Sequence, residues 1–91
     1  TMYRDRLNWP EARRYFGWSL ELSRKRGDVQ GVAYAEQQLA HVAIETGQLA
    51  EAQGLLDAAQ PLFEQAEDYA MVVNTVISRA DLAAERREFD K

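Results

Sequence analysis

The sequence predicts an all-α fold built from antiparallel helix pairs that repeat along the chain. Ala, Glu, Lys, Leu and Arg make up 43 of the 91 residues, close to the half that is typical of long helices. Turn-forming pairs at residues 27–28, 47–48 and 67–68 interrupt the helical pattern at equal intervals, which argues against one continuous coiled coil. Because the connections are so short, neighbouring helices are expected to run antiparallel.

The first full helix is predicted over residues 9–26, after a short helical stub over residues 1–6. Asn8 suits the N-cap position, since its side chain can accept hydrogen bonds from the free amide groups of the first turn. Glu11 follows three residues later, and Pro10 lies in the first turn, where a missing amide proton costs little.

The second and fourth helices are predicted over residues 28–46 and 68–86. Asp28 and Asp68 suit their N-cap positions, because each carboxylate can accept from free amides and favours the positive end of the helix dipole.

The third helix, predicted over residues 49–66, carries a clear apolar stripe at three- and four-residue steps. The stripe comprises Leu49, Ala52, Leu55, Leu56, Ala59, Leu62, Phe63 and Ala66. Pro61 lies inside this helix and removes one backbone hydrogen bond, so we expect the helix to bend or break near Gln60.

An internal repeat is indicated when the sequence is aligned with a shifted copy of itself. The shift that places Asp28 on Asp68 also places Ala40 on Ala80 and aligns the turns and the caps. We call this shift of 40 residues the repeat interval. Two helices make each repeat. Residues 1–26 are read as the end of one repeat, 28–66 as one complete repeat and 68–91 as the start of the next, within a longer array.

Small and bulky residues recur at the positions where paired helices would approach closely. They are Ala40 and Ala80 in one helix, Gly47 at the turn, Ala12 and Ala52 early in the next helix, and Phe16 and Leu56 four residues later. In these residues the chain resembles the tetratricopeptide repeat (TPR) family, in the long-period variety of bacterial signalling regulators and kinesin light chains. The repeat interval is longer than the usual TPR repeat of about 34 residues. The chain departs from the family pattern at Glu36, where an aromatic residue is expected, and at Arg79, which replaces the Leu39 of the earlier copy.

The resemblance implies a right-handed, TPR-like α-solenoid that serves as a non-catalytic protein–protein interaction module of a larger signalling or regulatory protein. Its groove, lined by the first helix of each repeat, would hold a peptide or a partner domain. The alternative is a structural spacer or self-association element without a ligand of its own.

The charge is segregated along the chain. Residues 1–26 hold 7 basic and 3 acidic residues, and residues 27–91 hold 4 basic and 12 acidic ones, within a net charge of −4. The acidic total argues against a general nucleic-acid binder, which would carry an excess of basic residues. The first helix carries a basic stripe that could bind an anionic partner. Alternatively, its residues cap the helix end and keep the surface soluble. The stripe comprises Arg13, Arg14, Arg24, Lys25 and Arg26. With no cysteine, no leader pattern and no long apolar run, we expect a cytoplasmic protein with no membrane span.

The residues that could carry chemistry are few. His41 is the single histidine, with Glu45 one turn away, and Asp81 and Glu85 occupy the matching positions of the next repeat. Without a second histidine or a thiolate, these groups favour a solvated polar face over a metal site. No serine has a histidine close in sequence, and no phosphate-binding glycine pattern occurs. We therefore expect no enzyme activity, no cofactor and no metal.

Candidate partner-binding residues include an acidic ladder at the repeat interval, which favours a cationic peptide segment. The ladder consists of Asp5, Glu45 and Glu85, with His41 and Asp81 one turn earlier. The other candidates, which are predicted to line the same face, are Tyr34, Gln37, Asn74 and Ile77.

The sequence also predicts which residues pack between the helices. The predicted core comprises Trp9, Ala12, Phe16, Leu39, Ala40, Ala43, Ala52, Leu56, Ala59, Val72, Val76 and Ala83, with Ala40 facing Ala52. Trp18, which stands where the next repeat has Ala58, is read as packing between repeats. The two ends should expose Tyr3, Leu7, Val73, Ile77 and Phe89. Such exposure should drive self-association of the isolated segment, whereas flanking repeats would cover the same residues in a longer array.

Overall fold

The structure, a computed structural model, describes the backbone of residues 9–89 and the side chains of residues 9–85. It contains four α-helices, and no strand occurs in that part of the chain. They are α2 (Trp9–Arg26), α3 (Val29–Glu45), α4 (Leu49–Gln65) and α5 (Tyr69–Phe89). The all-α prediction is confirmed, and the helix bounds agree with the predicted ones to within three residues. The predicted stub and the Asn8 cap lie outside the described residues.

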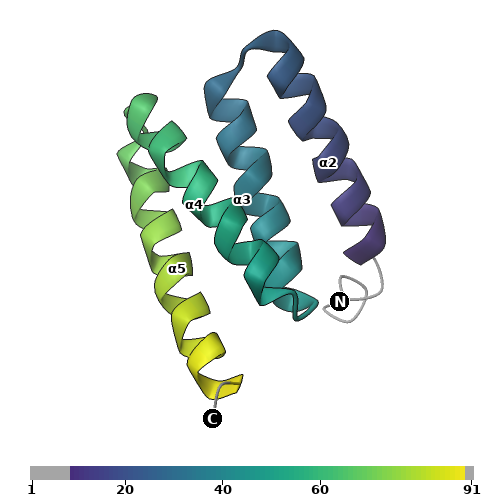
Figure 1. Cartoon of the computed structure of the whole chain (residues 1–91). Coiled ribbons are helices and arrows are strands. Elements are labelled where there is room, and N and C mark those ends of the chain that lie inside the picture. The colour runs from purple at the N-terminus through teal and green to yellow at the C-terminus, as the bar shows by residue number, and fades with distance from the viewer. Residues whose placement is uncertain (1–8, 90–91) are drawn as a thin grey trace.

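Each helix packs on the helix before it in the sequence. Contacts join α2 to α3, α3 to α4 and α4 to α5. Consecutive helices run in opposite directions (Figure 1). Because each helix packs on its neighbours in the sequence, α2 and α5 form the two outer edges of the arrangement. None of the helices within the described residues is long and apolar enough to span a membrane.

The three turns between the helices share one geometry and recur at half the repeat interval. Each contains a residue with positive φ: Gly27 at 70°, Gly47 at 81° and Glu67 at 59°. In every turn the amide of this residue donates to the carbonyl three residues back, at 3.0–3.1 Å, and the next amide donates to the carbonyl five residues back, at 2.7–3.0 Å. These bonds satisfy the free carbonyls of the preceding helix end, and glycine adopts the left-handed conformation without a steric penalty.

The predicted aspartate caps are confirmed at both positions. The Asp28 carboxylate accepts from the Gly31 amide at 3.0 Å, and the Asp68 carboxylate accepts from the Met71 amide at 3.4 Å. A Cβ on Gly31 would lie 2.6 Å from the Ser23 hydroxyl and 2.6 Å from the Asp28 carboxylate. A larger residue at position 31 would therefore displace the Asp28 carboxylate that caps α3 or the Ser23 hydroxyl at the end of α2.

Of the two outcomes expected at Pro61, a break of the helix does not occur, since α4 continues through Pro61 to Gln65. Pro61 is exposed, whereas Ala59 and Phe63 on either side of it are completely buried. The packing of these flanking residues holds the backbone helical despite the lost hydrogen bond, and water can reach the carbonyl that lacks a donor.

The core consists of two clusters in which alanines bring the helices close together. One cluster joins Ala40 and Ala43 of α3 to Ala52 and Leu56 of α4 and to Leu82 of α5. The other joins Ala33, Ala59 and Phe63. Ala40 and Ala52 are both 0% exposed and belong to the same cluster, as expected from the small residues at these positions.

The predicted core is right for six residues and wrong for two. Leu39, Ala40, Ala43, Ala52, Leu56 and Ala59 are buried; Trp9, Ala12, Phe16 and Val72 are half-buried; Val76 and Ala83 are exposed. Ala43 of α3 is buried against α4, but Ala83, its counterpart in α5, is exposed. Burial in α5 falls instead on Thr75 and Leu82, which the predicted core omitted together with Ala33, Ala35 and Val42. Phe63, predicted in the apolar stripe of its helix, is also buried.

Ion pairs connect helices across the core. Arg13 of α2 pairs with Glu51 of α4. Arg79 of α5 pairs with Asp57 at 3.0 Å and donates to the Gln60 side chain at 2.6 Å. Arg79 thus replaces the apolar contact expected of a leucine with polar contacts to α4.

Candidate binding groove

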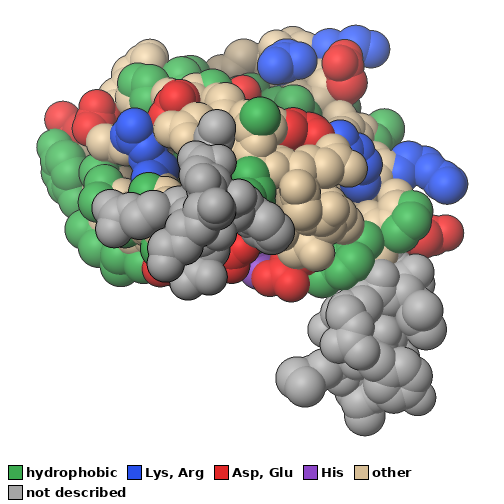
Figure 2. Space-filling view, turned by 60° about the horizontal axis from the view of Figure 1, so that its bottom comes forward, with side chains coloured by type: hydrophobic (Ala, Val, Ile, Leu, Met, Phe, Trp, Pro, Cys, Tyr) green, Lys and Arg blue, Asp and Glu red, His purple; other side chains and the backbone are tan. Residues whose placement is uncertain are grey.

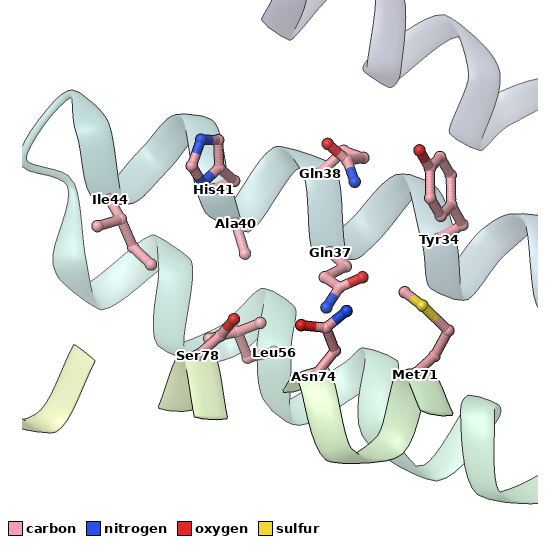
Figure 3. Close-up of a pocket in the computed structure, with 10 residues that line it drawn as sticks. All are labelled: Tyr34, Gln37, Gln38, Ala40, His41, Ile44, Leu56, Met71, Asn74 and Ser78. Atoms are coloured by element: carbon pink, nitrogen blue, oxygen red, sulfur yellow. The ribbon is translucent and has the colours of Figure 1, made fainter. Parts of the chain in front are cut away.

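A groove runs between α3 and α5 and consists of two adjoining hollows. The first hollow, of about 360 Å³, has an apolar floor that includes Ala40 and Leu56. Around this floor lie Tyr34, Gln37, Gln38, His41, Ile44, Met71, Asn74 and Ser78 (Figure 3). The floor comes from α3 and α4, and the walls come from α3 and α5.

Two side-chain amides face each other in the first hollow. Figure 3 shows the amide of Gln37 on α3 turned toward the amide of Asn74 on α5. Gln37 is buried and Asn74 is exposed. An amide side chain offers both donors and an acceptor, so this pair can bind the backbone of an extended peptide. Tyr34, which is half-exposed, contributes an aromatic ring to the same hollow.

The second hollow, of about 770 Å³, is acidic. Its lining includes Glu45 of α3 and Asp81 and Glu85 of α5, together with His41, Ile44, Ser78 and Ala84. His41, Ile44 and Ser78 line both hollows, so the two form one continuous groove. Figure 2 shows acidic side chains beside the single histidine on this face of the molecule.

His41 is held by an aromatic contact with the neighbouring helix. Its ring lies 6.0 Å from the Trp9 ring of α2, at an interplanar angle of 71°. Among the described residues no three His, Asp or Glu side chains lie close enough together to hold a metal ion.

Seven of the nine predicted partner-binding residues line the groove. They are Tyr34, Gln37, His41, Glu45, Asn74, Asp81 and Glu85. Ile77 does not line it; its side chain is 54% exposed outside the two hollows. Asp5 lies outside the described residues.

The sequence analysis missed several lining residues, among them Gln38 and Ser78. These two are one repeat interval apart and share helical spacing with the predicted positions, so extending the same pattern by one turn would have found them.

The basic stripe of α2 is partly used inside the fold. Arg13 pairs with Glu51, and Arg24 lies 4.0 Å from the carboxylates of Glu21 and Glu36. The remaining members, Arg14, Lys25 and Arg26, are exposed. Trp18 is also exposed, at 61%, and it contacts Tyr15 of its own helix, with 6.2 Å between ring centroids.

Glu36 is the one buried carboxyl of the described residues. Its residue exposure is 6%, and its Oε1 atom has no hydrogen-bond partner in the described part of the chain. Burial raises the pKa of the Glu36 carboxyl above its ordinary value, and the Arg24 guanidinium opposes this rise. Glu36 does not line either hollow, so its raised pKa belongs to the packing of the helices.

No protein-family model matches the chain, and no match was found among curated proteins or solved structures. The functional argument therefore rests on the groove itself.

Proposed function

We propose that this chain is a non-catalytic interaction module whose groove between α3 and α5 binds an extended, cationic segment of a partner protein. In this proposal the helix pairs are TPR-like repeats of a right-handed α-solenoid, within a larger cytoplasmic signalling or regulatory protein. The recurrence supports it: α2 and α4 begin one repeat interval apart, as do α3 and α5, and all three turns are alike.

The observation that carries the proposal is that three carboxylates from two helices line the same hollow at one end of the groove. Glu45 comes from α3, whereas Asp81 and Glu85 come from α5. Glu45 lies in the last turn of α3, where the helix dipole disfavours an anion, so its position does not stabilise its own helix. A lysine or arginine side chain in this hollow would be attracted to all three groups at once.

The rest of the groove matches a peptide backbone. The facing amides of Gln37 and Asn74 can donate to carbonyls and accept from amides of an extended segment. The half-buried side chains of Ile44 and Met71 offer an apolar surface for an aliphatic stem, because lysine and arginine carry long methylene chains below their charged groups.

Peptide titration tests this proposal. Arg-rich and neutral peptides of equal length are titrated against the wild type and against the triple variant Glu45→Gln, Asp81→Asn, Glu85→Gln. Exposed charge pairs contribute about 0.5 kcal/mol each, so the triple variant should bind the Arg-rich peptide about tenfold more weakly. Binding should also weaken as salt is added.

A matched control separates the groove from the overall charge of the protein. The triple variant Glu11→Gln, Glu21→Gln, Glu64→Gln removes the same number of charges from exposed carboxylates that do not line the groove. This control should retain wild-type affinity. Equal affinities of the wild type and the groove variant for the Arg-rich peptide would contradict the proposal.

A spacer or self-association element is the second candidate, and a separate observation favours it. Large apolar side chains are exposed on α2 and α5, at the two edges of the arrangement.

A further inference from the structure

The exposed apolar side chains concentrate on two surfaces of the molecule. Among the described residues, seven large hydrophobic side chains are between 48% and 64% exposed: Tyr15 and Trp18 on α2, Tyr34 in the groove, and Tyr69, Val73, Val76 and Ile77 on α5. We call Tyr15, Trp18 and the half-buried Leu22 the α2 face, and the four α5 residues with Ala80 and Ala83 the α5 face. Apolar side chains gather along the edge that α5 forms (Figure 2).

The α5 face corresponds to a surface that α3 buries. Val73, Ala80 and Ala83 lie one repeat interval after Ala33, Ala40 and Ala43. These three alanines of α3 are 0% exposed, and they pack in clusters with Ala52, Leu56, Ala59 and Phe63 of α4. On α5 the equivalent positions are all exposed. The α5 face is thus suited to covering by a helix that resembles α4.

The α2 face offers the matching surface. Tyr15 and Leu22 lie one repeat interval before Leu55 and Leu62 of α4. Leu55 and Leu62 are half-buried and pack against the two clusters that join α4 to α3. The α2 face is therefore equivalent to the side with which α4 covers α3, although it carries larger, aromatic side chains.

We propose that copies of this chain associate head to tail, with the α2 face of one copy packed on the α5 face of the next as α4 packs on α3. The inference goes beyond the proposed peptide binding, because neither face includes a residue that lines the groove. A contact between two different surfaces leaves one face of each kind free in a dimer, so the assemblies grow with concentration beyond the dimer, into an open chain or a closed ring.

The repeat equivalence and the charge of α2 select a second copy, in head-to-tail contact, as the occupant. The helix α2 holds 5 basic and 2 acidic residues, whereas α5 holds 3 of each. Pairing of two α2 faces therefore brings like charges together, which is unfavourable. Head-to-tail contact avoids this repulsion, because it places the basic α2 of one copy on the neutral α5 of the next. Burial of the aromatic and aliphatic side chains supplies most of the free energy.

Two single substitutions, each of which disables one face, test the proposal on the 91-residue chain. Trp18→Glu places a charge in the α2 face, and Ile77→Glu places one in the α5 face. Both side chains are more than half exposed, so the variants should fold, which circular dichroism and the thermal midpoint check. The molar mass is measured by light scattering coupled to size exclusion, from micromolar to near-millimolar concentration.

The wild type should increase in mass with concentration, and each variant alone should be monomeric, with association weakened about tenfold or more. The mixture gives the decisive result. An equimolar mixture should form a 1:1 dimer that grows no further, because the intact α2 face of Ile77→Glu fits the intact α5 face of Trp18→Glu. Tyr34→Glu, a control in the groove, should associate like the wild type.

Three results would overturn the inference. A wild type that stays monomeric over the whole range would show that the faces do not bind each other. Self-association of Trp18→Glu alone at wild-type strength would show that two α5 faces pair. Loss of association in Tyr34→Glu would place the contact in the groove.

Discussion

Replacing Glu36 with glutamine is expected to stabilise the fold at neutral pH, although the substitution removes an ion pair. Glu36 is 6% exposed, and its Oε1 atom has no hydrogen-bond partner among the described residues. A buried polar group without a partner costs about 1–3 kcal/mol, and more when it is charged. Glutamine keeps the shape of the side chain and removes its charge.

The opposing contribution of Arg24 is small. Its guanidinium lies 4.0 Å from the Glu36 carboxylate, and its side chain is 55% exposed. Because solvent screens this ion pair, the pair offsets less than about 1 kcal/mol of the cost of burying the Glu36 charge. We therefore expect Glu36→Gln to raise the free energy of unfolding by about 1–2 kcal/mol at pH 7. This is measurable in a 91-residue domain, for which the total is about 5–14 kcal/mol.

The pH dependence gives a second signature. Because burial raises the pKa of Glu36 in the folded state, the folded state holds this proton at a pH where the unfolded state has lost it. The wild type therefore gains stability relative to the variant as the pH falls through the raised pKa toward the ordinary value of 4.5. The advantage of Glu36→Gln should be largest at neutral pH and should shrink on acidification.

Urea unfolding followed by circular dichroism, at pH 7 and near pH 4.5, measures both effects. Glu64→Gln, a substitution of an exposed carboxylate with the same change of charge, is the control and should change stability by less than about 0.5 kcal/mol. If Glu36→Gln lowers stability at pH 7, or if its effect does not depend on pH, the carboxylate is stabilised in the fold and the reasoning is refuted.

Two further predictions concern the packing and the turns. Ala40→Leu and Ala52→Leu should each lower the free energy of unfolding by about 1–3 kcal/mol, because both alanines are 0% exposed in one cluster; the exposed control Ala58→Leu should be nearly neutral in thermal unfolding, and equal midpoints for all three would show that the helix pairing is wrong. Gly47→Ala should destabilise by about 1 kcal/mol, because φ is 81° there, whereas Gly54→Ala should stabilise by about 0.5–1 kcal/mol, because it lies in a helix with nothing near its Cβ position. Shifts of the same sign in urea titrations of the two glycine variants would contradict the assigned backbone conformations.

The sequence by itself determined the features that depend on neighbouring residues along the chain. The helix bounds and the turns follow from apolar periodicity and from glycine at positions 27 and 47. The caps follow from Asp28 and Asp68, whose carboxylates bond amides three residues away. The repeat interval also pairs residues that line the groove together, such as His41 with Asp81 and Glu45 with Glu85.

Only the tertiary structure decided which side of each helix is covered. A repeat makes Ala83 equivalent to the buried Ala43, yet Ala83 is exposed, because burial depends on a neighbouring helix and not on the residue itself. Ile77 lines neither hollow, although its repeat equivalent Gln37 lines the first one. Pro61 stays inside α4 because the packing of Ala59 and Phe63 outweighs one lost hydrogen bond. Glu36 is buried although removing a carboxylate from water costs free energy. The helices that pack around it determine this burial, and no local pattern in the sequence predicts it.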